Sequence, residues 1–251
     1  MKQGRPPLPL IIGRKPLLEA LQQGTAVEKI FLLRTATGPE INEIKQLARE
    51  NNIPISQVPV EKLNGFTKAQ HQGVVAWTGL IQYIDLQAAI SHVVDQGIVP
   101  LFVLLDGVTD VRNVGAIARS ALCCGAQGLI LPTSSSASLT EDAIKTSAGA
   151  LNKLMLCRIP SVPQAIDVLR LNGIQVLGTQ MKGSVPVFET DLTIPSCIVM
   201  GAEDTGISKD VLKRADHLIR IPMVTSFDSL NVSVATGMIL YEALRQRILN
   251  G

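Results

Sequence analysis

Five polar residues between positions 113 and 231 have side chains and positions suited to catalysis. Asn113 and Arg119 follow one apolar segment, and Glu203 follows a second. Ser229 and Asn231 follow a third, where Ser229 is a plausible helix N-cap. Asn231 is harder to explain, because an asparagine in the first turn of a helix competes for the backbone hydrogen bonds. A purely structural interpretation stays open here, with Asn113 near a helix start and Arg119 on its solvated face.

The loop around Glu203 excludes two common nucleotide sites. Gly201 and Gly206 have the spacing of a P-loop, but the Lys-Ser/Thr pair that completes a P-loop is missing after Gly206. No G-x-G-x-x-G sequence follows the apolar run over residues 100–106, so a Rossmann dinucleotide site is unsupported. Glu203 and Asp204 would repel a bare phosphate. The loop therefore favours a cationic or amine-bearing ligand.

Neither a metal centre nor a disulfide framework is indicated. Asp106 and Asp110 could face one metal ion, but no third ligand is evident. The four cysteines, at positions 123, 124, 157 and 197, form no C-x-x-C pair, and the three histidines are scattered. We expect no metal and free thiols in a reducing compartment. With no signal peptide and no apolar run near ~18 residues, we expect a cytoplasmic protein without a membrane partner.

The polar residues lie where predicted strands end. Apolar runs predict strands over 100–106, 128–132, 154–159, 174–180, 196–202 and 217–223. Helical patterns separate them, over 114–124, 140–151, 162–172, 208–214 and 229–248. Continuous apolar strands alternating with helices predict an α/β domain with a mostly parallel sheet covered on both faces. Ligands of such sheets bind beyond the carboxyl ends of the strands.

A smaller unit precedes this sheet. Residues 10–77 alternate between helical and strand patterns, so we predict one domain over 1–77, a linker over 78–97 and a second domain over 98–251. The net charge of the whole chain is only +2, but residues 1–70 hold ten Lys/Arg and six Glu. A basic first part is compatible with an RNA-binding module.

Three motifs together resemble one enzyme family. LDGVTDVRNVGAIARSA, VMGAEDTGIS and IPMVTSFDSLNVSVATG match, in order, motifs of the SpoU/TrmH RNA ribose 2′-O-methyltransferases. IIGRKPLLEAL and HQGVVA resemble the substrate-binding domain of one subgroup, the guanosine methylases of 23S ribosomal RNA. The resemblance implies a SPOUT-like sheet with a trefoil knot, a preceding L30e-like RNA-binding domain, and S-adenosylmethionine as the methyl donor.

The resemblance also implies roles for particular residues. It gives catalytic positions to Asn113, Arg119, Glu203, Ser229 and Asn231. It implies that backbone groups of the knotted loops bind the cofactor, around Thr179, Gly201, Ile221, Met223 and Leu230. The chain departs from the family at two places. Val111 replaces the usual proline of the first motif, and Thr225 replaces a common glycine of the third.

Methyl transfer to a ribose hydroxyl is an in-line displacement, so alignment of the reactants should supply much of the acceleration. A guanidinium has a pKa above ~12 and resists deprotonation. We therefore expect Arg119 to bind the substrate phosphate and stabilise the developing alkoxide, ahead of acting as a base. The other four polar residues would fix Arg119 and the ribose.

The sequence leaves alternatives open for the oligomeric state and for the RNA substrate. Family members are dimers, and the apolar side of the last helix, with Leu230, Val234, Met238 and Tyr241, fits either a homodimer interface or a core. The expected reaction is 2′-O-methylation of a guanosine in 23S ribosomal RNA. The alternatives are a methylase of the same family acting on transfer RNA or another ribosomal site, and a non-catalytic RNA-binding assembly factor.

Overall fold

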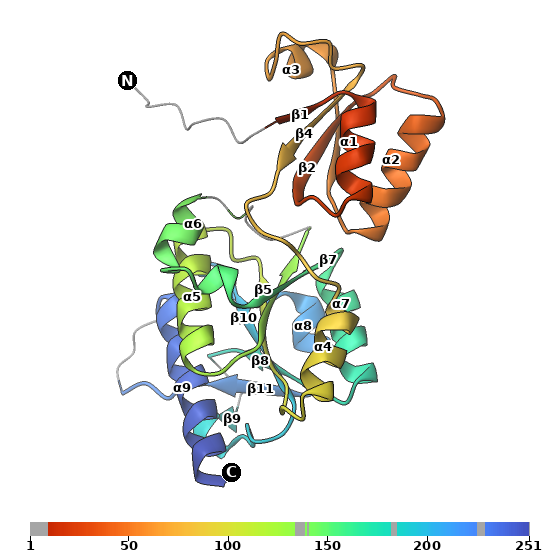
Figure 1. Cartoon of the computed structure of the whole chain (residues 1–251). Helices are drawn as coiled ribbons and strands as arrows, with labels where there is room; N and C mark the ends of the chain where they lie inside the picture. Colours follow the sequence, from red (N-terminus) through yellow and green to blue (C-terminus); the bar gives the residue numbers. More distant parts are fainter. Residues whose placement is uncertain (1–9, 134–138, 140, 182–184, 225–228, 251) are drawn as a thin grey trace. The chain divides into compact units, whose positions relative to one another are not determined.

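The chain forms two compact units in the structure, which is a computed structural model. They comprise Met1–Gln82 and Tyr83–Gly251, and each has its own sheet (Figure 1). The structure describes residues 10–133, 139, 141–181, 185–224 and 229–250. None of the helices among these residues is long and apolar enough to cross a membrane.

The second unit contains a parallel sheet with the strand order β7-β6-β5-β10-β8-β11-β9. Its strands are β5 (Leu101–Asp106), β6 (Gly128–Pro132), β7 (Met155–Ile159), β8 (Gln175–Thr179), β9 (Val185–Pro186), β10 (Ser196–Gly201) and β11 (His217–Arg220). All residues of β5, β6 and β10 are buried, which explains why these strands are apolar except for Asp106 and Ser196 at two strand ends. The α/β class with a mostly parallel sheet is therefore confirmed, and only the two-residue strand β9 was not predicted.

Helices cover both faces of this sheet (Figure 1). One face carries α4 (Leu86–Asp95), α7 (Val162–Leu171) and α8 (Lys209–Arg214). The other carries α5 (Val111–Cys123), α6 (Glu141–Thr146) and α9 (Val232–Asn250). The helix predicted over 140–151 is interrupted after α6, because Ala148 and Gly149 adopt positive φ angles of 49° and 86°, and a 3-10 turn follows over Ala150–Asn152.

The segment predicted as a linker, residues 78–97, contains α4. Leu86, Ile90 and Val93 of this helix are buried in one hydrophobic core with Phe102 of β5 and Ile166 of α7. This spacing of three and four residues is that of an amphipathic helix face. The structure therefore differs from the linker prediction: α4 packs in the second unit, and the two units divide between Gln82 and Tyr83.

The first unit has a four-stranded sheet in the order β1-β4-β2-β3. Its elements are β1 (Leu10–Ile12), α1 (Arg14–Gln22), β2 (Val27–Leu33), α2 (Pro39–Glu50), β3 (Ile55–Val58), α3 (Val60–Asn64) and β4 (Val74–Thr78). The helices α1 and α2 enclose a core on one face of the sheet. On the other face, Phe31, Phe66 and Trp77 form an aromatic cluster with centroid distances of 4.7 to 5.8 Å.

Candidate active site

A cavity of about 360 Å³ lies at the carboxyl ends of β8, β10 and β11. All five residues predicted to bind the cofactor line it: Thr179, Gly201, Ile221, Met223 and Leu230. Glu203 and Ser229 line it as well, whereas Asn113, Arg119 and Asn231 do not. Much of the remaining wall is apolar, with Met200, Ile207, Leu212, Ile219 and Ile239. The predicted strand ends therefore meet around one hollow.

Gly201 shapes one side of this cavity. A Cβ atom on Gly201 would lie 2.1 Å from the carbonyl carbon of Gly206 and 2.3 Å from the nitrogen of Ile207, so no other residue fits without moving the backbone. Two backbone hydrogen bonds, of 2.9 and 3.1 Å, join Ala202 to Gly206 and close the loop between them. Gly206 has a φ of 68°, which glycine adopts at little cost. The closed loop presents Glu203 to the cavity.

The two aspartates near the end of β5 have partners of their own. Asp106 is buried, and its Oδ2 accepts a hydrogen bond of 2.6 Å from the backbone N–H of Ser208. Asp110 caps α5 by accepting the N–H of Arg112, and it pairs with the Arg112 guanidinium at 3.0 Å. That guanidinium holds the pKa of the Asp110 carboxyl below its ordinary value. The described residues contain no group of three or more side chains that could hold a metal ion.

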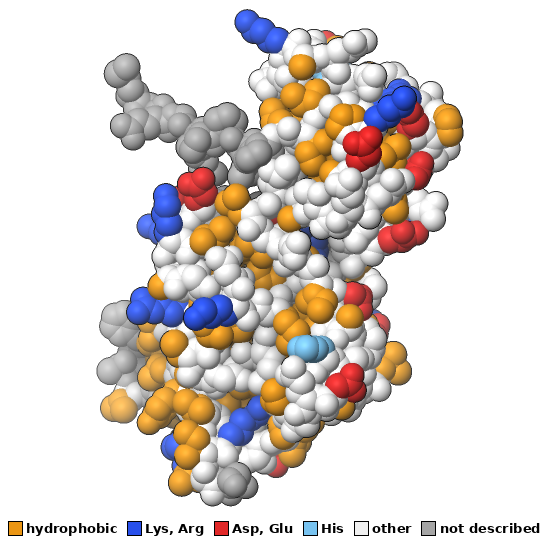
Figure 2. Space-filling model, in the orientation of Figure 1, with side chains coloured by type: hydrophobic (Ala, Val, Ile, Leu, Met, Phe, Trp, Pro, Cys, Tyr) orange, Lys and Arg blue, Asp and Glu red, His pale blue; other side chains and the backbone are white. Residues whose placement is uncertain are grey.

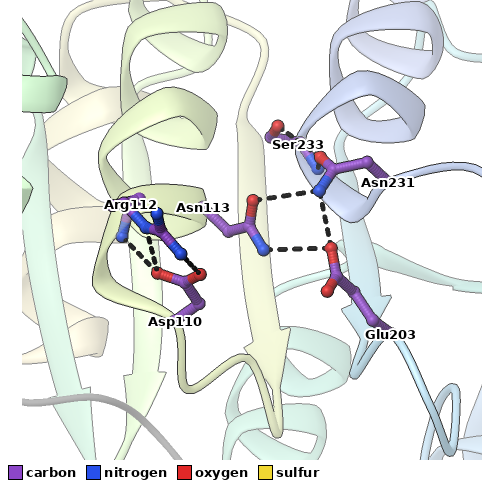
Figure 3. Close-up of polar contacts among 6 residues, drawn as sticks. All are labelled: Asp110, Arg112, Asn113, Glu203, Asn231 and Ser233. Carbon is purple, nitrogen blue, oxygen red and sulfur yellow. Dashed lines mark hydrogen bonds and ion pairs between the residues drawn. The ribbon is translucent and has the colours of Figure 1, made fainter.

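Asn113, Glu203 and Asn231 form a hydrogen-bonded ring beside the cavity (Figure 3). Glu203 Oε1 accepts hydrogen bonds from Asn113 Nδ2 at 3.1 Å and from Asn231 Nδ2 at 2.6 Å. Asn231 Nδ2 also donates to Asn113 Oδ1 at 3.2 Å. The three side chains come from α5, from the loop after β10 and from the residue before α9. The ring therefore joins the three sequence motifs at one point.

Asn231 lies before α9 rather than inside its first turn. Its carbonyl accepts the N–H of Ala235 at 3.0 Å, and its Oδ1 accepts the N–H of Ser233 at 2.9 Å, which is the geometry of an N-cap. The prediction of Ser229 as the cap was wrong, because α9 begins three residues later, at Val232. The predicted conflict between Asn231 and the helix backbone therefore does not arise.

Ser233 is a residue that the sequence did not single out. Its hydroxyl donates a hydrogen bond of 2.6 Å to Asn231 Oδ1, in addition to the bond from its backbone N–H (Figure 3). With Oδ1 occupied by two donors, the Nδ2 group of Asn231 is turned toward Glu203 and Asn113. Only its position two residues after the asparagine could have drawn attention to it.

Arg119 lies apart from this ring. It is six residues beyond Asn113 on α5, about 9 Å along the helix axis, and its side chain is exposed. Within the described part of one chain, it makes no hydrogen bond or ion pair. Asn113, Glu203 and Asn231 therefore hold one another in the single chain, and the predicted contact with Arg119 is not among their interactions.

The two departures from the family pattern have different outcomes. Val111 is the first residue of α5, a position where proline is common because no intrahelical N–H partner is required. The Asp110 cap holds this helix start in place of the proline ring. Thr225 lies outside the described residues.

Comparison with known proteins identifies the family. Residues 100–241 match the family described as SpoU rRNA Methylase, which is more than half of the chain. The chain belongs to the SpoU rRNA methylase family. Residues 10–83 match a second family, described as RNA 2′-O ribose methyltransferase substrate binding. Together, the two matches account for both units of this SpoU methylase.

Relatives agree with this assignment over most of the chain. The 23S rRNA (guanosine-2′-O-)-methyltransferase RlmB of Pseudomonas syringae pv. tomato is 37% identical over 222 residues, covering 88% of each chain. The SpoU methyltransferase AviRb of Streptomyces viridochromogenes, in complex with AdoMet, has a TM-score of 0.60 and 29% identity, covering 96% of this chain and 90% of its own. The A. aeolicus TrmH/SpoU tRNA modifying enzyme is 34% identical, with a TM-score of 0.56, and covers 60% of this chain and 77% of its own.

This SpoU methylase is an RNA 2′-O-methyltransferase that uses S-adenosylmethionine. The residues around the cavity fit that donor. Apolar walls suit an adenine ring and a methylene chain, and the carboxylate of Glu203 suits the positive charges of a sulfonium and an ammonium group. The glycine at position 201, where a Cβ would clash with the backbone of Gly206 and Ile207, lets the loop after β10 fold back closely on the strand end that lines the cavity.

Proposed function

We propose that the protein methylates the ribose of a guanosine in 23S ribosomal RNA, in the cytoplasm where that RNA is found. The ring of Asn113, Glu203 and Asn231 beside the donor cavity is the observation that carries the methyl-transfer assignment. The 37% identity to the RlmB relative favours the guanosine of 23S RNA. The basic first unit, which matches a substrate-binding family, supplies the grip on RNA.

Bound S-adenosylmethionine supplies the electrophilic methyl group. The chain holds the mouth of the cavity rigid, because one oxygen of Glu203 fixes the amides of Asn113 and Asn231. Ser229 lines the same cavity and can donate a hydrogen bond to the ribose. Arg119 binds the phosphate next to the target ribose and stabilises the oxygen as it loses its proton. The proton passes to an acceptor other than the guanidinium, which has no lone pair to receive it.

A homodimer explains why Arg119 is apart from the ring in one chain. Figure 2 shows hydrophobic side chains gathered over α9, and five large apolar side chains of this helix are exposed: Val234, Met238, Tyr241, Ile248 and Leu249. Such a patch is typical of a protein interface. We propose that two copies associate through this helix, so that Arg119 of each reaches the cavity of its partner.

Mixing two inactive variants tests this arrangement. Arg119→Ala and Glu203→Ala proteins should each retain very little activity alone, whereas mixed dimers contain one cavity with both residues and should recover up to about a quarter of the wild-type activity. Arg112→Ala is the matched control, since Arg112 is an exposed arginine of the same helix whose partner is Asp110. A monomeric mass in light scattering at micromolar concentration, or activity of Arg119→Ala near that of the wild type, would contradict the proposal.

The RNA target is tested by mapping 2′-O-methyl groups in ribosomal and transfer RNA from cells that lack the protein. We expect one guanosine mark of 23S RNA to disappear and to return with the wild-type protein. Loss of a transfer RNA mark would instead support the second candidate, which the 34% identity to the A. aeolicus tRNA modifying enzyme favours. Unchanged marks in both RNA classes would indicate a non-catalytic assembly factor.

A further inference from the structure

The first unit contains a polar cavity of about 450 Å³ of its own. Three segments line it: the start of α1, the loop between β2 and α2, and the turn before β4. The lining residues are Arg14, Lys15, Leu33, Thr35, Ala36, Thr37, Glu40, Gln72 and Gly73. Its volume is within the range of small-molecule and nucleotide pockets, ~300–1,000 Å³.

Arg14 holds the three segments together. Its backbone N–H donates to Gln72 Oε1 at 3.2 Å, and its Nε donates to the Gln72 carbonyl at 3.0 Å. Its Nη1 donates to the carbonyl of Thr37 at 3.2 Å and lies 3.6 Å from a carboxylate oxygen of Glu40. The guanidinium therefore serves as a structural clamp, and its charge is largely matched by Glu40.

The backbone around the clamp is held in unusual conformations. Gly13 and Gly73 have φ angles of 99° and 82°, and Gln72 has a φ of 52° although it carries a side chain. A non-glycine residue in the left-handed region persists only where its surroundings hold it, and such residues are concentrated at functional sites. The carbonyl and the side chain of Gln72 are both held by Arg14, so this turn is fixed before any ligand arrives.

Lys15 supplies a charge that the fold does not use. Its side chain is exposed at the cavity, and it makes no hydrogen bond or ion pair with the residues that the structure describes. Thr35 and Thr37 present exposed polar side chains to the same hollow. One free ammonium group with hydroxyl neighbours suits a phosphodiester and the polar edge of a base or ribose.

We propose that this cavity binds one unpaired nucleotide of the RNA substrate, with Lys15 on its phosphate and Thr35 and Thr37 on its base or ribose. The inference rests on the proposed function, because it requires that the first unit grip RNA. It goes further in naming the site and in preferring unpaired RNA. Such RNA exposes the base edges that a pocket can contact, whereas a duplex hides them.

The test measures binding of the full-length protein to a fluorescein-labelled unpaired RNA oligonucleotide, and to the same sequence as a duplex, over a range of KCl concentrations. The affinity for RNA falls as salt rises, and losing one phosphate contact makes the plot of log K against log salt less steep by ~0.7 for single strands. Over a tenfold range of salt, from ~0.1 M to ~1 M, the wild type should therefore lose about fivefold more affinity than a variant without that contact. We expect a lower affinity and this less steep plot for Lys15→Ala. Thr37→Val should weaken binding without changing the slope, and it leaves the carbonyl that Arg14 uses.

Arg49→Ala is the matched control. Arg49 is an exposed cation of the same unit, nine residues beyond Glu40 on α2 and therefore ~13 Å further along the helix axis. That distance exceeds the Debye length of ~10 Å at 0.1 M salt, so its affinity and slope should match the wild type. Thermal unfolding midpoints equal to that of the wild type would confirm that the variants are folded.

Two results would overturn the inference and leave the proposed function standing. In the first, Lys15→Ala and Thr37→Val bind RNA with the same affinity and the same salt dependence as the wild type. In the second, the wild type binds unpaired and duplex RNA with equal affinity. Binding of neither RNA by the wild-type protein would instead count against the proposed function as well.

Discussion

Asn231 Nδ2 donates a hydrogen bond to Glu203 Oε1 across 2.6 Å, and this contact joins the start of α9 to the loop after β10. The same oxygen accepts Asn113 Nδ2, so one carboxylate holds two amides from separate elements. Hydrogen bonds to an ionised acceptor are roughly twice as strong as neutral ones. Glu203 is therefore the central residue of the ring.

Replacing Glu203 by alanine should remove both bonds at once. We expect kcat for methyl transfer to fall by about 10²-fold, since a misplacement of ~1 Å in a catalytic site can cost that much. Glu203→Gln keeps an acceptor oxygen and should lose less. Transfer of a radioactive methyl group to RNA measures the effect. Asp210→Ala is the control, because Asp210 is an exposed carboxylate of α8 that does not line the cavity. Equal losses for the two alanine variants would contradict the central role of Glu203.

Ser233 should act through Asn231. Ser233→Ala removes the hydroxyl that donates to Asn231 Oδ1 but keeps the backbone N–H bond. One hydrogen bond contributes ~1 kcal/mol, so we expect kcat to fall about fivefold with little change in the Kd of S-adenosylmethionine. Single-turnover kinetics and calorimetry separate these quantities. Ser233→Thr restores the hydroxyl and should restore the rate; failure to do so would mean that bulk at this position matters more than the hydrogen bond.

Arg247 should be the main polar anchor of the C-terminal end of α9. Its guanidinium donates to four backbone carbonyls, at 2.8 to 3.2 Å, those of Val99, Pro100, Leu192 and Ile194. Burial lowers the pKa of this guanidinium below its ordinary value. Arg247→Ala leaves the carbonyls without these donors and should lower the free energy of unfolding by about 2–4 kcal/mol.

Urea denaturation followed by far-UV circular dichroism measures that loss. Arg247→Lys should be intermediate, because an ammonium group has three N–H donors and cannot bond to all four carbonyls. Arg245→Ala is the control, since Arg245 is exposed and its ion pair is with Glu242 on the same helix. An unfolding midpoint for Arg247→Ala equal to that of Arg245→Ala would show that the anchor is unimportant.

The four thiols should differ in reactivity. Burial raises the pKa of Cys157 to about 12 and raises that of Cys197 as well, whereas Cys123 is exposed. The thiolate is the reactive form, and at pH 8 a thiol of pKa 12 is ionised in about one molecule in 10⁴. We expect iodoacetamide to label Cys123 first, Cys124 more slowly because burial raises its pKa, and Cys157 and Cys197 only after denaturation.

Peptide mass spectrometry locates the labels. The raised pKa of Cys157 also makes the free energy of unfolding depend on pH. The stabilising contribution of the buried neutral thiol is fully present below the ordinary thiol pKa of ~8.5 and is lost as the pH rises toward 12. Cys123→Ser should remove the fastest phase alone. Labelling of Cys157 in the folded protein at pH 8 would show that this part of the core opens readily.

The strands could be predicted because burial on both faces leaves a clear pattern. β6, Gly128–Pro132, has the predicted bounds. The strand predicted over 217–223 ends at Arg220 instead, because the chain turns along the cavity and Pro222 has no N–H to continue the ladder. α4 was harder to predict, since a lone amphipathic helix in a segment without strands shows no partner in the sequence.

The ring could not be predicted from periodicity. Asn113 and Asn231 are 118 residues apart, and they meet because β5 and β10 are neighbours, with Asp106 paired to Gly201 in the register of the sheet. Strand order is a property of the packed sheet and not of any one strand. The trefoil knot implied by the resemblance stays a prediction for the same reason, because periodicity does not record how a chain is threaded.

Trp77 is the single tryptophan of the chain, and its ring lies 4.8 Å from that of Phe31 in the aromatic cluster of the first unit. Tryptophan emission, excited where tyrosine does not absorb, therefore comes from this unit alone, while Tyr83 and Tyr241 of the second unit stay dark. Far-UV circular dichroism records both units. The native sequence thus carries its own fluorophore for following the melting of one unit separately from the other, without a label or a substitution.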